Sequence, residues 1–288
     1  MTVTLVVLSV AVAAALVVFI LSAVRTLPDP IDPADRERAV VRRLARHPRL
    51  SRFLRQRLDR RTAGGLMLTL ALLATFVVAL VTGLLLDMVD SSSGLASLDD
   101  DVANWGAANA DSAAVDLLRV LTYLGDTPVV VAALLVAGLI DFVRHRRIEV
   151  FLFLGVVIVG EKLIVNGLKE IVDRSRPDVM ALVGWQGPSF PSGHSAAAAA
   201  VWPAFALLLT RGCPRVVRAS SAAAAALIAF GVAASRALLG VHWLTDVVAG
   251  LAIGYGWFLV CAVMFGGRAQ RLGDPVTARP SGIPLRPG

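Results

Sequence analysis

The chain lacks the residues on which many small or soluble folds depend. Only 2 of its 288 residues are cysteines, Cys213 and Cys261, too few for a disulfide framework or a cysteine metal site. Charged residues make up only 17% of the chain and aromatic residues only 6%. Among 28 basic residues, Lys162 and Lys169 are the only lysines. These shortages exclude a disulfide-stapled scaffold, and they set two lysines apart from a background of arginine.

Apolar residues are abundant instead. They make up 57% of the chain, and its mean hydropathy is +0.73. Apolar runs of about 20 residues recur, and a run of that length spans the hydrocarbon core of a bilayer. Seven such segments are predicted, at 3–24, 66–89, 127–143, 148–168, 195–210, 219–234 and 243–266. The predicted fold class is therefore all-α, a polytopic transmembrane helical bundle with a six-span core and one extra N-terminal span.

The segments divide the chain into parts. The predicted parts are an N-terminal transmembrane anchor (1–24), an arginine-rich cytoplasmic linker (25–65), a six-span core (66–266) and a disordered cytoplasmic tail (267–288). The first segment lacks the basic start and small-residue cleavage site of a signal peptide, so we expect a retained anchor. In the linker, apolar residues at helical spacing from Leu50 to Leu58 predict an amphipathic helix on the inner surface, with a solvated linker as the alternative.

The distribution of arginine predicts the orientation. Residues 25–61 contain 12 arginines, and the loops near 144–147 and 211–218 are also basic. The loop 90–126 carries seven aspartates and one arginine. Because basic loops stay on the cytoplasmic side, we expect the N-terminus outside, the C-terminus inside and a plasma-membrane location.

The net charge of +7 raises the question of nucleic-acid binding. No basic patch interleaved with aromatic residues accompanies it, so we expect no nucleic-acid partner, and basic loops that face anionic lipid. In the acidic outer loop, apolar residues from Leu95 to Trp105 predict an interfacial helix. The three adjacent aspartates at 99–101 are expected to form a solvated face, with a cation site as the alternative.

Three polar stretches lie where apolar segments begin or end on the predicted outer side. They are KEIVDRSRP at 169–177, PSGH at 191–194 and SRALLGVHWLTD at 235–246. The orientation is deduced from arginines in other loops, so the placement of all three stretches on one face agrees with it independently. Charged groups at a membrane edge are costly and usually functional.

The spacing within these stretches favours phosphate chemistry. Lys169 and Arg176 bracket a turn, and an arginine fork matches two phosphate oxygens. A glycine at the start of a helix lets backbone amides approach an anion. His242 and Asp246 are four residues apart, so on a helix they share a face, and the carboxylate can accept Nδ1–H and leave Nε2 as a nucleophile. Taken singly, each group has a structural alternative, such as a snorkelling Arg236.

At these residues the chain resembles the type 2 phosphatidic acid phosphatase superfamily, whose pattern is KxxxxxxRP, PSGH and SRxxxxxHxxxD. The resemblance implies a metal-independent phosphatase without a cofactor, in which a histidine is transiently phosphorylated. The implied roles are phosphate binding by Lys169, Arg176, Arg236, Ser192 and Gly193, nucleophilic attack by His242, protonation of the leaving group by His194, and orientation of His242 by Asp246.

Other polar residues are candidates for a supporting part around the site. They are Lys162, Asn166, Glu161 and Ser235. Lys162 and Glu161 lie within an apolar span, where ionisable groups must face protein or water, and mutual pairing is the alternative. Trp185 and Phe190 precede the second motif, where they contact a lipid tail or serve as interfacial anchors.

We therefore expect an integral membrane lipid phosphatase that removes a terminal phosphate from a lipid phosphate or isoprenoid diphosphate at the outer face. A vanadate-dependent haloperoxidase-like enzyme is one alternative, and a non-enzymatic lipid carrier or scaffold is another. Monophosphate and diphosphate lipids require the same catalytic groups, so both substrate classes stay open, as does the oligomeric state.

Overall fold

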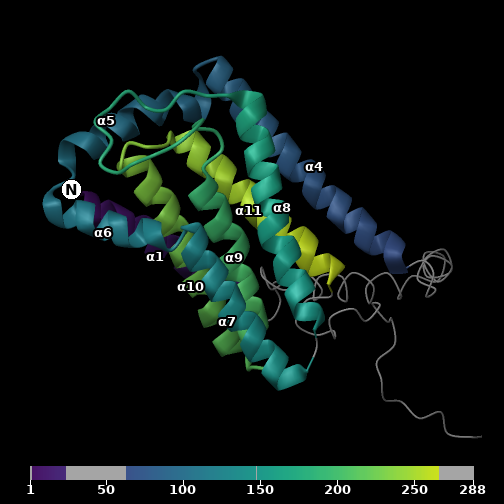
Figure 1. Cartoon of the computed structure of the whole chain (residues 1–288). Coiled ribbons are helices and arrows are strands. Elements are labelled where there is room, and N and C mark those ends of the chain that lie inside the picture. Colours follow the sequence, from purple (N-terminus) through teal and green to yellow (C-terminus); the bar gives the residue numbers. More distant parts are fainter. Residues whose placement is uncertain (1, 24–62, 147, 266–288) are drawn as a thin grey trace, which may run out of the picture.

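The computed structural model describes residues 2–23, 63–146 and 148–265, and every regular element in these ranges is a helix (Figure 1). The amphipathic helix predicted in the linker and the disorder predicted for the tail lie outside the described residues. Seven helices are apolar. They are α1 (Val3–Ala23), α4 (Ala63–Asp90), α7 (Thr127–His145), α8 (Glu149–Val172), α9 (Gly193–Leu209), α10 (Arg215–Leu238) and α11 (Leu244–Met264).

The predicted transmembrane bundle is confirmed. Six of the seven helices are long and apolar enough to cross a membrane, including α1 near the N-terminus. The seventh, α9, has 17 residues. It packs against α7, α8, α10 and α11, so protein rather than lipid surrounds it, and most of its residues are buried. The observed helix bounds lie within a few residues of the predicted segments.

The segment that connects α4 to α7 in the sequence forms short helices, which cover one end of the bundle. They are η1 (Gly94–Leu98), α5 (Asp99–Asn109) and α6 (Ser112–Tyr123). Helical structure is present where a helix was expected between Leu95 and Trp105, divided between η1 and α5, while α6 was not predicted separately. Asp111 caps α6 by accepting a hydrogen bond from the backbone N–H of Ala114 at 2.8 Å.

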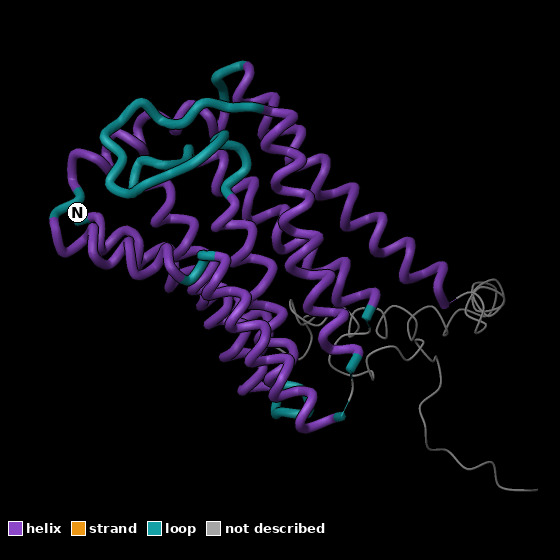
Figure 2. The backbone as a smooth tube through the Cα atoms, in the orientation of Figure 1, coloured by secondary structure: helices purple, strands orange, loops and turns teal. Residues whose placement is uncertain are grey.

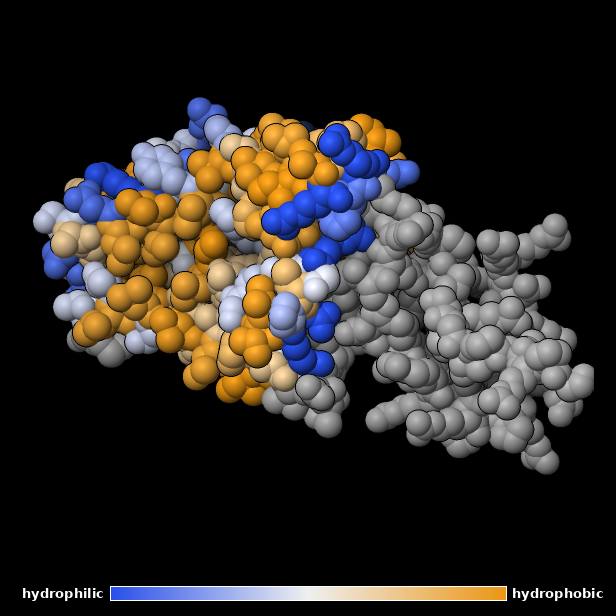
Figure 3. Space-filling view, turned by 90° about the horizontal axis from the view of Figure 1, so that it is seen from below, coloured by the Kyte–Doolittle hydropathy of each residue, from blue (hydrophilic) through white to orange (hydrophobic). Residues whose placement is uncertain are grey.

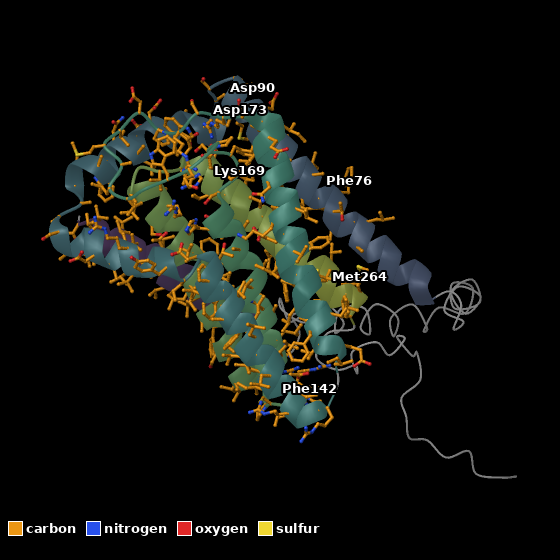
Figure 4. The ribbon with its side chains drawn as sticks, viewed as in Figure 1. Phe76, Asp90, Phe142, Lys169, Asp173 and Met264 are labelled. Carbon is orange, nitrogen blue, oxygen red and sulfur yellow. The ribbon has the colours of Figure 1, made fainter. Side chains whose placement is uncertain are left out.

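The helices alternate in direction, which brings distant parts of the chain to the same end. Figure 2 shows the long loop between α8 and α9 at that end, and Figure 1 places the N-terminus beside α6. In Figure 4, Asp90 and Asp173 mark this end of the bundle, and Phe142 and Met264 lie toward the other. At that other end, Arg215 Nε donates to the carbonyl of Ser22 at 2.7 Å and ties α1 to α10.

Small residues let the central helices approach closely. Residues 196–200 of α9 are all alanines and are buried. Gly254 of α11 faces them, and a Cβ placed there would lie 2.1 Å from the carbonyl oxygen of Ala196. Such small-residue contacts are typical of helix packing in membranes, where the hydrophobic effect does not drive association.

Large apolar side chains face outward. Phe76 of α4 is 64% exposed and Leu163 of α8 is 70% exposed. Figure 3 shows broad hydrophobic areas on the surface seen from below, with hydrophilic side chains gathered in separate patches. In water such areas would be a liability, whereas lipid tails cover them in a bilayer.

Candidate functional site

A cavity of about 790 Å³ lies at the end of the bundle covered by α6 and the α8–α9 loop. Its wall includes residues from all three polar stretches singled out in the sequence. The predicted site residues in this wall are Lys169, Arg176, Gly193, His194, Arg236 and His242. The helix ends therefore bring together groups that are up to 73 positions apart in the sequence.

The α8–α9 loop folds back over the end of α8 and holds two cations. Lys169 Nζ donates to the carbonyl oxygen of Pro188. Arg176 donates through Nε to Gly187 O at 2.9 Å and through Nη1 to Val241 O at 2.5 Å. Its guanidinium also lies over the ring of Trp185, 4.9 Å from the ring centroid. Burial lowers the pKa of Arg176.

Arg236, in the last turn of α10, supplies the third cation. Its Nη1 donates to Thr122 Oγ1 of α6 at 3.0 Å, and its Nε is buried without a hydrogen-bond partner among the described residues. An unpartnered buried donor is costly, and a phosphate oxygen would satisfy it. The carbonyl of Arg236 accepts the backbone N–H of His242 at 3.2 Å, so this residue also fixes the turn that carries the histidine.

His242 is buried in the turn between α10 and α11. Gly240 makes this turn possible with a φ of +72°, in the left-handed region that favours glycine. Burial lowers the pKa of His242 to about 4, so its imidazole is neutral at pH 7. Its Nδ1 lies 3.4 Å from Ser189 Oγ, and its Nε2 lies 3.4 Å from Arg176 Nη1. The Nε2 lone pair therefore faces the cationic side of the cavity.

The expected helical relation between His242 and Asp246 was wrong. The helix α11 begins at Leu244, so His242 precedes it, and Asp246 accepts the backbone N–H of Trp243 at 3.0 Å as a cap of the helix start. The distance from His242 Nδ1 to Asp246 Oδ2 is 3.6 Å, too long for a hydrogen bond. Ser189 Oγ donates to the same oxygen and so links the two residues.

Asp246 is held in place by Arg174, which the sequence analysis missed. Arg174 Nη1 lies 2.6 Å from Asp246 Oδ1, and Nη2 lies 2.8 Å from Asp99 Oδ2. Asp99 is buried and also accepts from Thr245 N at 2.9 Å. The prediction of a solvated face was therefore wrong for Asp99.

No group of three His, Cys, Asp or Glu side chains in the described part of the chain is arranged to hold a metal.

His194, the second residue of α9, pairs with a carboxylate that the sequence analysis also missed. Its Nε2 lies 2.5 Å from Asp126 Oδ1. A carboxylate only accepts hydrogen bonds, so Nε2 carries the hydrogen, and Nδ1 is the remaining ring nitrogen. Asp126 lies directly before the Thr–Pro start of α7, which is the sequence signal that could have placed it at this end.

Ser192 and Gly193 differ in how they meet the cavity. Ser192 is fully buried and caps α9, accepting from Ser195 N at 3.4 Å and Ser195 Oγ at 2.9 Å. Its backbone N–H donates to the carbonyl oxygen of Asp246 at 3.0 Å. Gly193 lines the cavity, and a Cβ there would meet only Val165, at 3.7 Å. The predicted hydroxyl contact of Ser192 with phosphate therefore has no support in this geometry.

The other polar candidates lie outside the cavity wall. The fully buried Glu161 pairs with Lys162 at 3.5 Å, as the mutual-pairing alternative expected. Asn166 is exposed on α8, and Ser235 Oγ donates to Val232 O of its own helix at 2.7 Å. The two loop aromatics also separate, since Trp185 lines the cavity whereas Phe190 is fully buried.

Comparison with known proteins connects this arrangement to a family. The sequence profile of the PAP2 superfamily matches residues 150–270. Phosphatidylglycerophosphatase B from Bacillus subtilis (strain 168) is 33% identical over 141 residues, which cover 48% of this chain and 69% of the relative. A lipid A 1-phosphatase from Rhizobium etli is 36% identical over 149 residues, which cover 48% of this chain and 57% of the relative.

A solved structure has a similar fold over about two thirds of this chain. The crystal structure of a transmembrane PAP2 type phosphatidylglycerolphosphate phosphatase from Bacillus subtilis superposes with a TM-score of 0.58 at 28% sequence identity. The match covers 64% of this chain and 93% of that structure. The match leaves out a larger share of this chain than of the relative.

Proposed function

We propose that this chain, which belongs to the PAP2 superfamily of membrane lipid phosphatases, releases the terminal phosphate of a lipid phosphate or diphosphate at the extracytoplasmic face. One observation carries the proposal. Lys169, Arg176 and Arg236 line one cavity, and none of them has a carboxylate within ion-pair distance in the described part of the chain. Their positive charges are held by neutral oxygen acceptors, which suits them to bind a phosphate.

The proposed reaction has two steps. His194 starts the cycle protonated on both ring nitrogens. His242 Nε2 attacks phosphorus while the bond to the leaving oxygen breaks, and His194 Nδ1 gives that oxygen its proton. His194 then takes a proton from water, the water oxygen attacks phosphorus, and the P–N bond breaks to return neutral His242. The three cations stabilise the negative charge that develops on the phosphoryl oxygens.

Two carboxylates position the histidines in this scheme. Asp246 acts on His242 through Ser189 and is itself neutralised by Arg174. Asp126 accepts from Nε2 of His194, so Nδ1 is the atom that exchanges a proton with substrate and water. Both arrangements follow the rule that a third group orients the acid or base.

The proposed orientation has support from the two ends of the bundle. The cavity end carries the acidic segment between α4 and α7, whereas Arg144, Arg146 and Arg218 lie at or near helix ends on the opposite side. Basic residues favour the cytoplasmic side.

The chemistry is tested by phosphate release from detergent-solubilised protein in the presence of a chelator. We expect His242→Ala to abolish release and to remove an acid-labile phosphoprotein trapped after rapid quenching. His145→Ala is the matched control, because His145 also has an aspartate four positions away in the sequence, Asp141 at 3.0 Å, but lies at the opposite end of the bundle. Unchanged release by His242→Ala would contradict the mechanism.

A further inference from the structure

Arg119 is a cation of the cavity wall that the proposed phosphate chemistry does not use. It lies on α6, three residues before Thr122, so the two side chains share a helix face. Thr122 Oγ1 accepts from Arg236 Nη1 at 3.0 Å. This contact places the Arg119 face of α6 beside one of the three phosphate-binding cations.

The charge of Arg119 is only weakly compensated. Its Nη2 donates to the carbonyl of Leu182 at 3.1 Å, which is a neutral acceptor. Its carboxylate neighbour is Asp116, 3.8 Å away and 77% exposed. An exposed pair of this length is screened by water and contributes little. The positive charge of Arg119 is therefore available to a ligand.

The cavity carries more positive charge than one phosphate requires. Four cationic side chains line it, those of Arg119, Lys169, Arg176 and Arg236, against the single carboxylate of Asp126. This leaves an excess of three positive charges even before the protonated His194 of the proposed first step is counted. A phosphate monoester carries about −1.5 to −2 at pH 7, so roughly one positive charge remains.

The cavity also has room for more than one phosphate. Its volume of about 790 Å³ equals that of more than twenty water molecules at about 30 Å³ each. A phosphate has only five heavy atoms. The space and the remaining charge together favour a head group with a further anionic group.

We propose that Arg119 binds a second phosphate group of the substrate and thereby favours lipids with two phosphates in the head group over phosphatidate. This inference rests on the proposed function. The second phosphate is either the neighbour in a diphosphate or a group separated from the terminal phosphate by a glycerol unit. Arg119 is a specificity residue in both cases, since the attacking and proton-transferring groups are elsewhere.

The test compares three substrates with identical acyl chains in mixed micelles with a chelator. They are phosphatidate, diacylglycerol diphosphate and phosphatidylglycerol phosphate. We expect Arg119→Gln, which can still donate to Leu182 O, to lower kcat/KM by about tenfold, mainly through KM, for at least one two-phosphate lipid. Phosphatidate should change by less than about twofold, and Arg119→Lys should retain most of the preference.

Which two-phosphate lipid is affected identifies the spacing of the two groups. Asp116→Asn is the matched control, because it removes the exposed neighbour of Arg119 and should leave the preference unchanged. An equal fall for all three lipids would mean that Arg119 only pins the loop at Leu182, and that result, like no fall at all, would overturn the inference. If the wild-type protein released phosphate from none of the three lipids and from no isoprenoid diphosphate, the proposed function itself would fail.

Discussion

Arg174 holds Asp246 through a contact of 2.6 Å between Nη1 and Oδ1, and it reaches Asp99 with its other terminal nitrogen. Arg176, two residues later, contacts only backbone carbonyls, the Trp185 ring and His242 within the described residues. Two arginines of one loop therefore differ in their partners. One is neutralised inside the fold, and the other keeps its charge for an anion.

Alanine substitutions of these two arginines should affect different properties, stability for Arg174 and phosphate release for Arg176. Arg174→Ala leaves two buried carboxylates without their partner, so we expect a loss of about 3–5 kcal/mol of stability. Arg176→Ala should abolish phosphate release with a much smaller change in stability. Thermal unfolding in detergent and phosphate release distinguish the two. Equal unfolding temperatures for both variants would contradict the assignment.

Asp126→Asn should weaken proton transfer by His194. We expect a fall in kcat of about tenfold to a hundredfold on a lipid phosphate, because the ring loses the negatively charged acceptor that orients it and favours its protonated form. With p-nitrophenyl phosphate, whose leaving group needs no proton, the fall should be much smaller. A purely structural defect would lower both activities alike.

The buried His242 should make stability depend on pH. Its pKa of about 4 in the folded protein lies below the value of about 6.5 in an unfolded chain, so between these pH values the unfolded state binds more protons. The free energy of unfolding should therefore fall as the pH drops from 7 to 4, by at most about 3 kcal/mol from this group. In chemical denaturation at pH 7 and pH 4.5, His242→Gln should show a smaller pH-dependent loss than the wild type. An identical loss would argue against a buried neutral imidazole.

Gly254→Ala should disturb the contact between α9 and α11. The added Cβ would lie 2.1 Å from Ala196 O, which is backbone and cannot rotate away. We expect a loss of about 1–3 kcal/mol, with reduced activity because the start of α9 carries His194. Gly155→Ala on α8 is the matched control, since a Cβ there meets nothing within 4 Å. A stable, fully active Gly254→Ala protein would show that the helices are not packed this closely.

The orientation can be measured by thiol labelling in intact cells. Ser93→Cys places an exposed thiol at the cavity end, and the native Cys213 lies in the loop at the opposite end. A membrane-impermeant maleimide should label residue 93 directly and Cys213 only after permeabilisation. The reverse pattern would place the cavity in the cytoplasm.

Much of the fold follows from the sequence because lipid imposes a simple rule. Every backbone polar group in a bilayer needs an internal partner, so long apolar runs become helices. The segments near 3–24 and 243–266 were predictable for this reason, and their ends agree with the structure within a few residues. The α9 helix was also predicted. Its 17 residues are short for a span, but an alanine-rich helix inside a bundle need not match the bilayer thickness by itself.

Within the site, the sequence identified the side chains better than their contacts. Lys169, Arg176 and His194 were singled out from short spacings and do line one cavity. The helical pairing of His242 with Asp246 was wrong, because a four-residue spacing indicates a shared helix face only if both residues lie inside the helix. Here α11 begins between them.

The sequence by itself determined a membrane-spanning helical protein with cationic and histidine side chains at the ends of its helices, since apolar length and local motifs are one-dimensional properties. Only the tertiary structure decided which charges are neutralised and which are free to bind an anion. That depends on contacts between distant segments, such as Asp99 with Arg174, Asp126 with His194 and Thr122 with Arg236. Electrostatic interactions act over a few ångströms in space, whatever the separation along the chain.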